Sequence, residues 1–191
     1  MAQPRGRERE LAILQIVREL LHEVGYERLT VDAVVVRARA SKSTIYGRWR
    51  DKATLVGAAL TARSLDQPHL QASSGRLRDD LAVLLRLWVE LAETESMTTF
   101  VSVLIAAGDE PTLAEIVRGT ALAPRRAECA LVVQWAAERG DIADGSGAEE
   151  LFDLLMGKVL VRYVLDVQPL TEAQQAAFVD EVLMPVLSPG R

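Results

Sequence analysis

The residues best suited to binding chemistry lie in one short basic stretch, between positions 37 and 50. Five basic side chains occur there, namely Arg37, Arg39, Lys42, Arg48 and Arg50. No acidic residue falls between positions 33 and 50. Lysine binds phosphate oxygens or guanine edges, and small hydroxyls such as those of Ser43 and Thr44 bind either. This local charge bias is typical of a surface that contacts nucleic acid.

Two short helices and a sharp turn are predicted to position these side chains. Thr30 suits the N-cap of the first helix, which carries a face of valines. The chain turns near Arg39, and Ser41 caps a second helix in which Ile45 points inward. Asp51 then caps a further helix. Two crossed helices of this kind form a helix-turn-helix, whose second member lies in the DNA major groove.

The order of residues in this stretch is more specific than its charge. LTVDAV is followed by SKSTIYGRW and then DK, which resembles the N-terminal domain of TetR-family transcriptional repressors. The matching positions are Thr30, Ser41, Lys42, Thr44, Ile45, Tyr46, Trp49 and Lys52. The resemblance covers about the first 60 residues. It implies a DNA-binding head over 1–60, with the motif at about 30–49, and a body over 61–191 that binds an effector and dimerises.

Three positions depart from the family pattern. Arg39 stands where the family usually has a turn glycine, and a non-glycine residue with positive φ costs roughly 1 kcal/mol. The turn is therefore expected either to differ or to place an additional charge near DNA. Val35 replaces a small alanine, and Gly47 replaces a side chain that often contacts bases.

Ten DNA-contacting residues are predicted from the resemblance together with the chemistry of the side chains. The backbone N–H groups of the first turn of the second helix favour anions, and the following basic residues are spaced to meet flanking phosphates. The predicted residues are Thr30, Arg39, Ser41, Lys42, Ser43, Thr44, Tyr46, Gly47, Arg48 and Lys52.

The sequence offers no convincing catalytic or metal-binding arrangement. The two histidines, His22 and His69, lack metal-ligand spacing, and Cys129 is alone. The acidic pairs 79–80 and 149–150 are interpreted as solvated charges at helix N-termini. We therefore predict that the protein is not an enzyme, holds no metal and needs no cofactor.

Composition and charge favour an all-helical protein with two functional parts. Hydrophobic residues make up 49% of the 191 residues and charged residues 26%, which is sufficient for a packed core. Residues 1–63 carry 12 Lys/Arg against 7 Asp/Glu, whereas the rest carries 10 against 20. A basic head on an acidic body fits a module that binds DNA joined to one that stays off it. No apolar run is long enough for a membrane span, and a bacterial cytoplasmic location is expected.

The helical pattern predicts about nine helices, with a three-helix head and a larger helical-bundle body. Residues 1–6 are predicted to form a loose arm. Pro124 is predicted to break or kink the helical run over 112–139, with one helix to about Ala121 and another from Pro124. The predicted helices outside the motif cover about 7–24, 52–65, 76–95, 97–107, 112–121, 124–138, 148–166 and 171–187.

The last two helices are predicted to form a homodimer interface. The helix at 148–165 is apolar almost all round, so it needs cover on more than one side, and the family's dimer forms there. A helix central to its own domain is the alternative. The predicted interface residues are Leu155, Val159, Arg162, Tyr163, Phe178 and Val182.

A cavity for an apolar or aromatic effector is expected in the body, because the resemblance implies one and polar groups are few at positions that appear buried. Plain core packing is the alternative for each aromatic residue taken singly. The predicted lining residues are Leu84, Trp88, Phe100, Leu104, Trp135, Phe152 and Met156.

These features predict a ligand-responsive transcriptional repressor that binds a palindromic operator as a homodimer. Its partners would be double-stranded DNA, a second copy of the chain and a small-molecule effector. A protein-interaction module with a degenerate helix-turn-helix is one alternative, which the departures at Arg39, Val35 and Gly47 leave open. A helical enzyme that processes a small molecule is the other.

Overall fold

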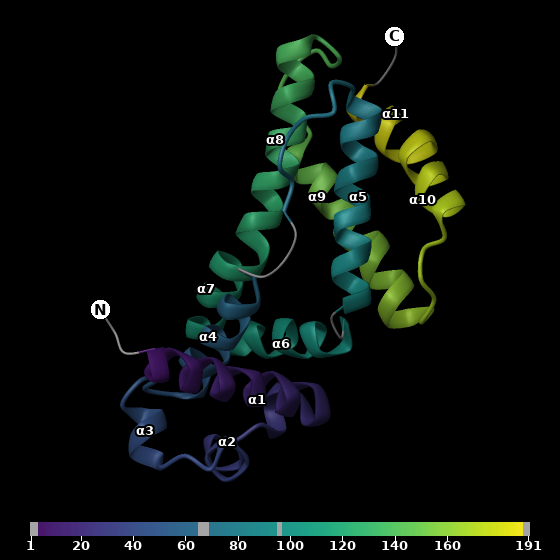
Figure 1. Ribbon diagram of the computed structural model, residues 1–191. Coiled ribbons are helices and arrows are strands. Elements are labelled where there is room, and N and C mark those ends of the chain that lie inside the picture. The colour runs from purple at the N-terminus through teal and green to yellow at the C-terminus, as the bar shows by residue number, and fades with distance from the viewer. Residues whose placement is uncertain (1–3, 65–68, 95–96, 189–191) are drawn as a thin grey trace. The chain divides into compact units, whose positions relative to one another are not determined.

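The computed structural model describes residues 4–64, 69–94 and 97–188 (Figure 1). All regular structure in these ranges is helical, which confirms the predicted all-α fold. The described residues form nine continuous helical segments. Three of these segments contain a π-helical turn (η), which joins directly to the neighbouring α-helix. The segments are α1 (Pro4–Arg28), α2 (Val31–Ala38), α3 (Lys42–Tyr46), α4 (Lys52–Ser64), α5 (Leu77–Thr94), α6 (Met97–Asp109), α7–η1–α8 (Pro111–Val117, Arg118–Leu122, Ala123–Arg139), α9–η2 (Ala148–Leu160, Val161–Leu165) and α10–η3–α11 (Glu172–Phe178, Val179–Leu183, Met184–Leu187).

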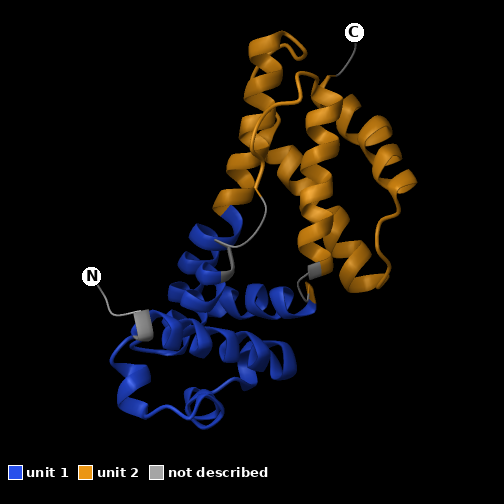
Figure 2. Ribbon diagram, in the orientation of Figure 1, with its two compact units in different colours: residues 1–67, 98–122 blue, residues 68–97, 123–191 orange. Residues whose placement is uncertain are grey.

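The chain divides into two compact units (Figure 2). Unit 1 comprises residues 1–67 and 98–122, and unit 2 comprises residues 68–97 and 123–191. The predicted functional boundary near residue 60 concerns DNA binding and effector binding, and it remains a prediction. The packing itself assigns most of α6 and all of α7 and η1 to the same unit as the N-terminal helices.

Unit 1 has one hydrophobic core to which the N-terminal helices and two later helices both contribute. Helix α1 packs against α2 and α4, and α4 packs against α7 and η1. Val17 and Leu55 are fully buried in this core, and Leu113 of α7 is buried with them. Trp49 is 7% exposed and belongs to this core. The helix-turn-helix therefore rests on α1, α4 and α7 together.

Helices α4 and α7 approach closely at Gly57. A Cβ atom at this position would lie 2.5 Å from Cγ2 and 2.8 Å from Cδ1 of Ile116. Only a residue without a side chain fits at that distance. The glycine thus sets how near the two helices can pack.

The first helix is longer than predicted at both ends. Pro4 begins α1, so residues 4–6 are helical and the prediction of a loose arm over them is wrong. Proline suits this position because its fixed φ matches a helix and its missing N–H would have no partner there. Gly25, with φ 73° and ψ 173°, interrupts the helix near the predicted end. A short turn through Tyr26 continues to Arg28.

The helical run is not broken at Pro124, but its α-helical geometry is interrupted just before the proline. The π-helical turn η1 precedes α8, and the helix continues through Pro124 from Pro111 to Arg139. A proline ring collides with the carbonyl four residues earlier in an α-helix. The wider π turn changes that spacing, which allows the helix to continue. Another π turn, η3, precedes Pro185 in the last helix.

Unit 2 consists of α5, α8, α9 and the last helical segment, which pack around a second core. Helix α5 contacts α8, α9, α10 and η3, so it is the central helix of this unit (Figure 1). Trp88 of α5 meets Phe152 of α9 edge to face, with ring centroids 5.6 Å apart. Cys129 is fully buried, and burial raises the pKa of its thiol to about 12. It therefore acts as a small apolar residue of the core.

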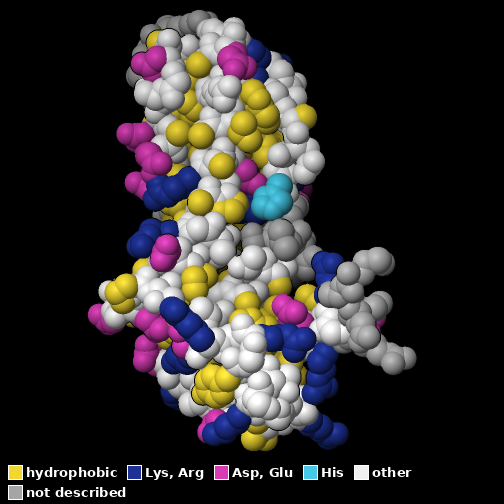
Figure 3. All heavy atoms as spheres, turned by 90° about the vertical axis from the view of Figure 1, so that its left-hand side faces the viewer, with side chains coloured by type: hydrophobic (Ala, Val, Ile, Leu, Met, Phe, Trp, Pro, Cys, Tyr) yellow, Lys and Arg dark blue, Asp and Glu magenta, His cyan; other side chains and the backbone are white. Residues whose placement is uncertain are grey.

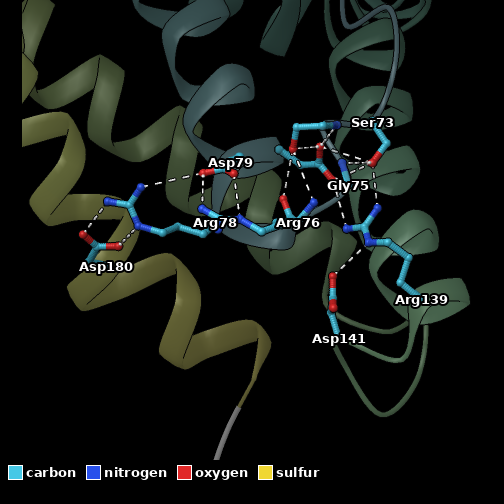
Figure 4. A network of polar contacts seen from close by, with 10 residues as sticks. Ser73, Gly75, Arg76, Arg78, Asp79, Arg139, Asp141 and Asp180 are labelled. Carbon is cyan, nitrogen blue, oxygen red and sulfur yellow. Dashed lines mark hydrogen bonds and ion pairs between the residues drawn. The ribbon is translucent and has the colours of Figure 1, made fainter.

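A polar network fixes the loop before α5 (Figure 4). Asp80 is 1% exposed and accepts hydrogen bonds from Ser74 N at 2.5 Å and Arg139 Nη2 at 2.9 Å. Arg139 also donates to Ser73 Oγ at 2.7 Å. The interpretation of Asp80 as a solvated charge is therefore wrong, because the loop folds over its carboxylate.

Within the described ranges, none of the helices combines the length and the apolar character that crossing a membrane requires.

Candidate nucleic-acid interface

The first helix of the motif begins at the predicted cap. Thr30 has extended backbone angles, and its Oγ1 accepts a hydrogen bond from Ala33 N at 3.1 Å. Val34 and Ala38 are buried against the rest of unit 1. Asp32 lies in the first turn of α2, where its negative charge interacts favourably with the positive end of the helix dipole.

The turn after α2 keeps the left-handed geometry that usually calls for glycine. Arg39 adopts φ 47° and ψ 42°, and its N–H donates to Val36 O at 3.2 Å. Ala40 N donates to Val35 O at 3.1 Å, which completes the helix C-cap. The turn therefore does not differ to accommodate the arginine side chain.

Arg9 of α1 supports this strained turn. Its Nη2 donates to Ala38 O at 3.1 Å and to Arg39 O at 3.0 Å. These carbonyls lie at the end of α2, where helix geometry leaves acceptors without partners. The sequence did not predict this role, because a basic residue near an N-terminus shows no sign of a partner 30 positions away.

The second helix of the motif begins with a cluster of hydroxyl groups. Ser41 Oγ accepts from Thr44 N at 3.0 Å and is hydrogen-bonded to the hydroxyls of Ser43, at 2.8 Å, and Thr44, at 2.7 Å. Ile45 is 1% exposed, as predicted, and fixes the helix to the core. The opposite face of α3 is left to solvent.

Gly47 ends α3 with ordinary helical angles, so positive φ is not why glycine occupies this position. A Cβ atom there would lie 2.8 Å from Ser43 O. The absent side chain lets the backbone close tightly at the end of the helix. Gly47 can therefore offer only its backbone to a ligand.

The exposed basic residues of the motif are partly paired with acids. Lys42 Nζ lies 2.9 Å from Asp32 Oδ1, and this hydrogen-bonded contact raises the pKa of the lysine. Arg37 Nη1 lies 2.5 Å from Glu23 Oε1. All four side chains are at least 40% exposed, so DNA phosphates can compete for both cations.

Lys52 is placed differently from the other predicted contacts. Its Nζ donates to Tyr26 O at 3.0 Å and lies 4.0 Å from the centroid of the Tyr26 ring. The lysine is half-buried and joins the start of α4 to the end of α1. In this conformation its ammonium group holds two helices together and is directed inward.

Most of the other predicted DNA-binding side chains are accessible on unit 1. Tyr46 is 49% exposed, and Thr44 is half-buried. In Figure 3 the dark-blue Lys and Arg side chains of unit 1 are spread around its lower end. The remaining exposed positions are Thr30, Arg39, Ser41, Lys42, Ser43, Gly47 and Arg48.

The fold and this exposed, capped helix define a helix-turn-helix protein. Residues 13–59 match the family model described as "Bacterial regulatory proteins, tetR family", and residues 71–182 match "Tetracyclin repressor-like, C-terminal domain". The chain belongs to the TetR family of DNA-binding transcriptional regulators. Members of this family are transcriptional regulators, which are not enzymes.

Relatives of known sequence support the same assignment. An uncharacterized HTH-type transcriptional regulator of Mycobacterium tuberculosis (strain ATCC 25618 / H37Rv) is 37% identical over 94% of this chain and 88% of its own length. The DNA-binding transcriptional repressor TetR of Mycobacteroides abscessus is 29% identical over 97% of each chain.

Solved structures share the fold. The crystal structure of the TetR family transcription regulator SCO0332 matches with a TM-score of 0.65 at 27% identity, covering 95% of this chain and all of its own. Salmonella enterica GusR has a TM-score of 0.71 at 15% identity, over 94% and 95% of the two chains, which shows the fold alone.

The predicted effector-pocket residues fall in both units. Leu84, Trp88 and Phe152 are buried in unit 2, where Trp135 and Met156 are half-buried. Phe100 and Leu104 are half-buried in unit 1. Trp88 Nε1 is buried and has no hydrogen-bond partner among the described residues, and such a donor is costly unless something accepts from it.

The predicted dimer residues are also divided. Leu155, Val159 and Phe178 are buried within unit 2 of a single chain, so their side chains pack inside the protomer. Arg162, Tyr163 and Val182 are half-buried. The apolar side chains near the end of α9 that reach solvent are instead Val161, Leu165 and Val167, which are 46%, 74% and 76% exposed.

Proposed function

We propose that this TetR-family regulator is a ligand-responsive repressor that binds a palindromic operator as a homodimer. The observation that carries the proposal is helix α3, capped by Ser41 and anchored by Ile45, with Lys42, Ser43 and Tyr46 exposed. Short recognition helices gain affinity when a two-fold dimer presents two copies one helical turn of DNA apart.

Within this proposal the DNA contacts fall into two kinds. Lys42, Ser43 and Thr44 meet base edges and phosphates in the major groove, and Tyr46 and Arg48 meet flanking phosphates. Thr30, Ser41, Arg39 and the backbone of Gly47 complete the surface. Lys52 joins it only if its ammonium group leaves the Tyr26 carbonyl.

The dimer contact is proposed at the end of α9 and on the last helical segment. Val161, Leu165 and Val167 are all exposed there, close together in sequence. Exposed apolar residues that have no partner are ordinarily scattered singly over a protein surface. Arg162 and Tyr163 border this surface in sequence, and Val182 lies on the last helical segment. All three stay in the proposed interface. Leu155, Val159 and Phe178 support it from inside the protomer.

The effector is proposed to be an apolar or aromatic molecule with an acceptor group. Trp88 supplies an apolar ring, and its buried Nε1 supplies a donor that has no acceptor within the described ranges. Leu84, Trp135, Phe152 and Met156 are the other proposed lining residues in unit 2. Phe100 and Leu104 belong to unit 1, and their part in effector binding stays a prediction. The 1–60 head would then bind DNA and the remainder would bind the effector. A cytoplasmic location is part of the same proposal.

The proposal is tested with the DNA next to the gene that encodes this chain. A gel-shift titration at fixed salt should show tight binding to an inverted repeat there and a steep fall in affinity as salt rises. Lys42→Ala should weaken operator binding, and Tyr46→Phe should weaken binding to all duplexes if its hydroxyl meets phosphate. Equal affinity of both variants and wild type would contradict this placement of α3.

A further inference from the structure

The helix-turn-helix segment, residues 31–50, contains a single acidic residue, and that residue is paired with the first residue of the proposed recognition helix. Asp32 is the sole acidic residue between Val31 and Arg50. It lies in the first turn of α2, whereas its partner Lys42 is the first residue of α3. The lysine Nζ is 2.9 Å from Oδ1 and 3.1 Å from Oδ2. The contact thus joins the two helices of the motif at the N-terminal end of the proposed recognition helix.

Fold stability does not account for this ion pair. Both side chains are 64% exposed, and pairs of this kind contribute little because water screens them. A carboxylate beside a DNA-binding helix also repels phosphates. Asp32 therefore weakens binding to any duplex unless a base edge supplies a donor to it.

The two head groups are complementary to a G·C base pair. In the major groove guanine presents its O6 and N7 acceptors, which lysine binds, and cytosine presents an N4 amino group, which aspartate accepts from. Because the ammonium and the carboxylate are already adjacent, one base pair or two neighbouring ones can satisfy both.

We propose that Asp32 and Lys42 together read a G·C pair in each operator half-site, and that Asp32 penalises duplexes lacking it. This inference rests on the proposed binding of α3 to an operator. At a matching site Lys42 donates to guanine and Asp32 accepts from cytosine. At other sites the carboxylate meets acceptors and phosphates, so binding is weakened.

The test starts from an operator that wild-type protein selects out of a random duplex pool. Affinities are then measured at one fixed salt for this operator, for versions with each G·C pair replaced by A·T, and for a scrambled duplex. At one position per half-site wild type should prefer G·C by about 5- to 150-fold. Asp32→Asn should lower that preference and bind the scrambled duplex more tightly than wild type.

Two further variants separate position from charge. Glu23→Gln removes an equal charge from the neighbouring exposed pair with Arg37 in the same unit, and it should keep the G·C preference. Asp32→Glu keeps the charge but displaces the carboxylate, and it should lose the preference. A wild-type preference that survives in Asp32→Asn, or that disappears equally in Glu23→Gln, overturns the inference. Failure of wild type to select any sequence would instead overturn the proposed function.

Discussion

The hydroxyl of Tyr26 donates a hydrogen bond to Glu110 Oε2 at 2.5 Å. Tyr26 follows the interruption of α1 at Gly25, and Glu110 is the N-cap residue of α7. The ammonium group of Lys52 lies over the ring of the same tyrosine and donates a hydrogen bond to its carbonyl oxygen. One buried residue thus links the end of α1, the start of α4 and the junction between α6 and α7.

Tyr26→Phe should destabilise the protein by about 1–2 kcal/mol, because Glu110 loses its donor while the ring and its contact with Lys52 remain. Burial, followed by the bond to Glu110, raises the pKa of Tyr26, so the hydroxyl keeps its proton throughout the physiological range. Urea unfolding of Tyr26→Phe, Glu110→Gln and the double variant measures the coupling. Strictly additive effects would show that the two groups do not interact in solution.

Arg39→Gly should raise the free energy of unfolding by about 0.5–1 kcal/mol, because glycine adopts a positive φ without strain. Arg9→Ala should lower it by about 1 kcal/mol, because two carbonyls at the end of α2 lose their donor. If Arg39 contacts DNA, the stabilised glycine variant will bind the operator more weakly. For Arg39→Gly the free energy of unfolding, measured by chemical denaturation, should then rise while the operator affinity, measured by gel shift, falls. A rise in both quantities would show that Arg39 does not contact the operator.

Gly57→Ala should cost about 1–3 kcal/mol, because the added methyl group meets Ile116 and over-packs the contact between α4 and α7. Gly108→Ala is the matched control, since that helical position has open space for a Cβ atom and alanine favours a helix. Thermal melts compare the two. Adding Ile116→Ala to Gly57→Ala should recover part of the lost stability, because it removes the side-chain atoms that the new methyl group meets. Stabilisation of both alanine variants alike would contradict the close approach.

Asp80→Asn should destabilise the protein by about 2–3 kcal/mol at neutral pH, because Arg139 and the Ser73–Gly75 loop lose a charged acceptor. Burial alone would raise the pKa of Asp80, but hydrogen bonds from Ser74, Ser73 and Arg139 hold it below its usual value. The carboxylate therefore stabilises the fold above the unfolded-state pKa of about 3.9 and ceases to as pH falls through its lower folded value.

The difference between wild type and Asp80→Asn should therefore shrink below about pH 4. The neighbouring variant Asp79→Asn provides the control, because Asp79 forms solvent-exposed pairs with Arg76 and Arg78 and should change stability by less than about 1 kcal/mol. Denaturant titrations at pH 7 and pH 3.5 test both variants. A gap for Asp80→Asn that is the same at both pH values would mean that its charge is not what the loop binds.

Local signals account for what could be predicted from the sequence. The caps at Thr30 and Ser41 and the capping box from Thr171 to Gln174 each need only three or four neighbouring residues to form. The helix-turn-helix could therefore be predicted from the sequence, as could the interruption of the first helix near Gly25. The positions of these caps depend on hydrogen bonds that the chain makes with itself nearby.

Features that depend on distant residues could not be predicted in this way. Asp79 and Asp80 are adjacent and identical in type, yet only one lies under the Ser73–Gly75 loop and beside Arg139. The apolar pattern of the α9–η2 segment likewise did not separate Leu155, which faces its own core, from Leu165, which is exposed. Periodicity marks which side chains seek burial, whereas tertiary packing decides which of them obtain it within one chain.

The core of unit 1 has a consequence for grafting. Val103 and Leu113 are buried with the residues that support the helix-turn-helix. A chimera that exchanges only the first 60 residues with a relative would bring an unmatched surface against α7, above all where Gly57 meets Ile116. A chimera that transfers operator recognition between such proteins therefore has to include residues 98–122 together with the amino-terminal helices. The transferred unit is encoded by two separate segments of the gene.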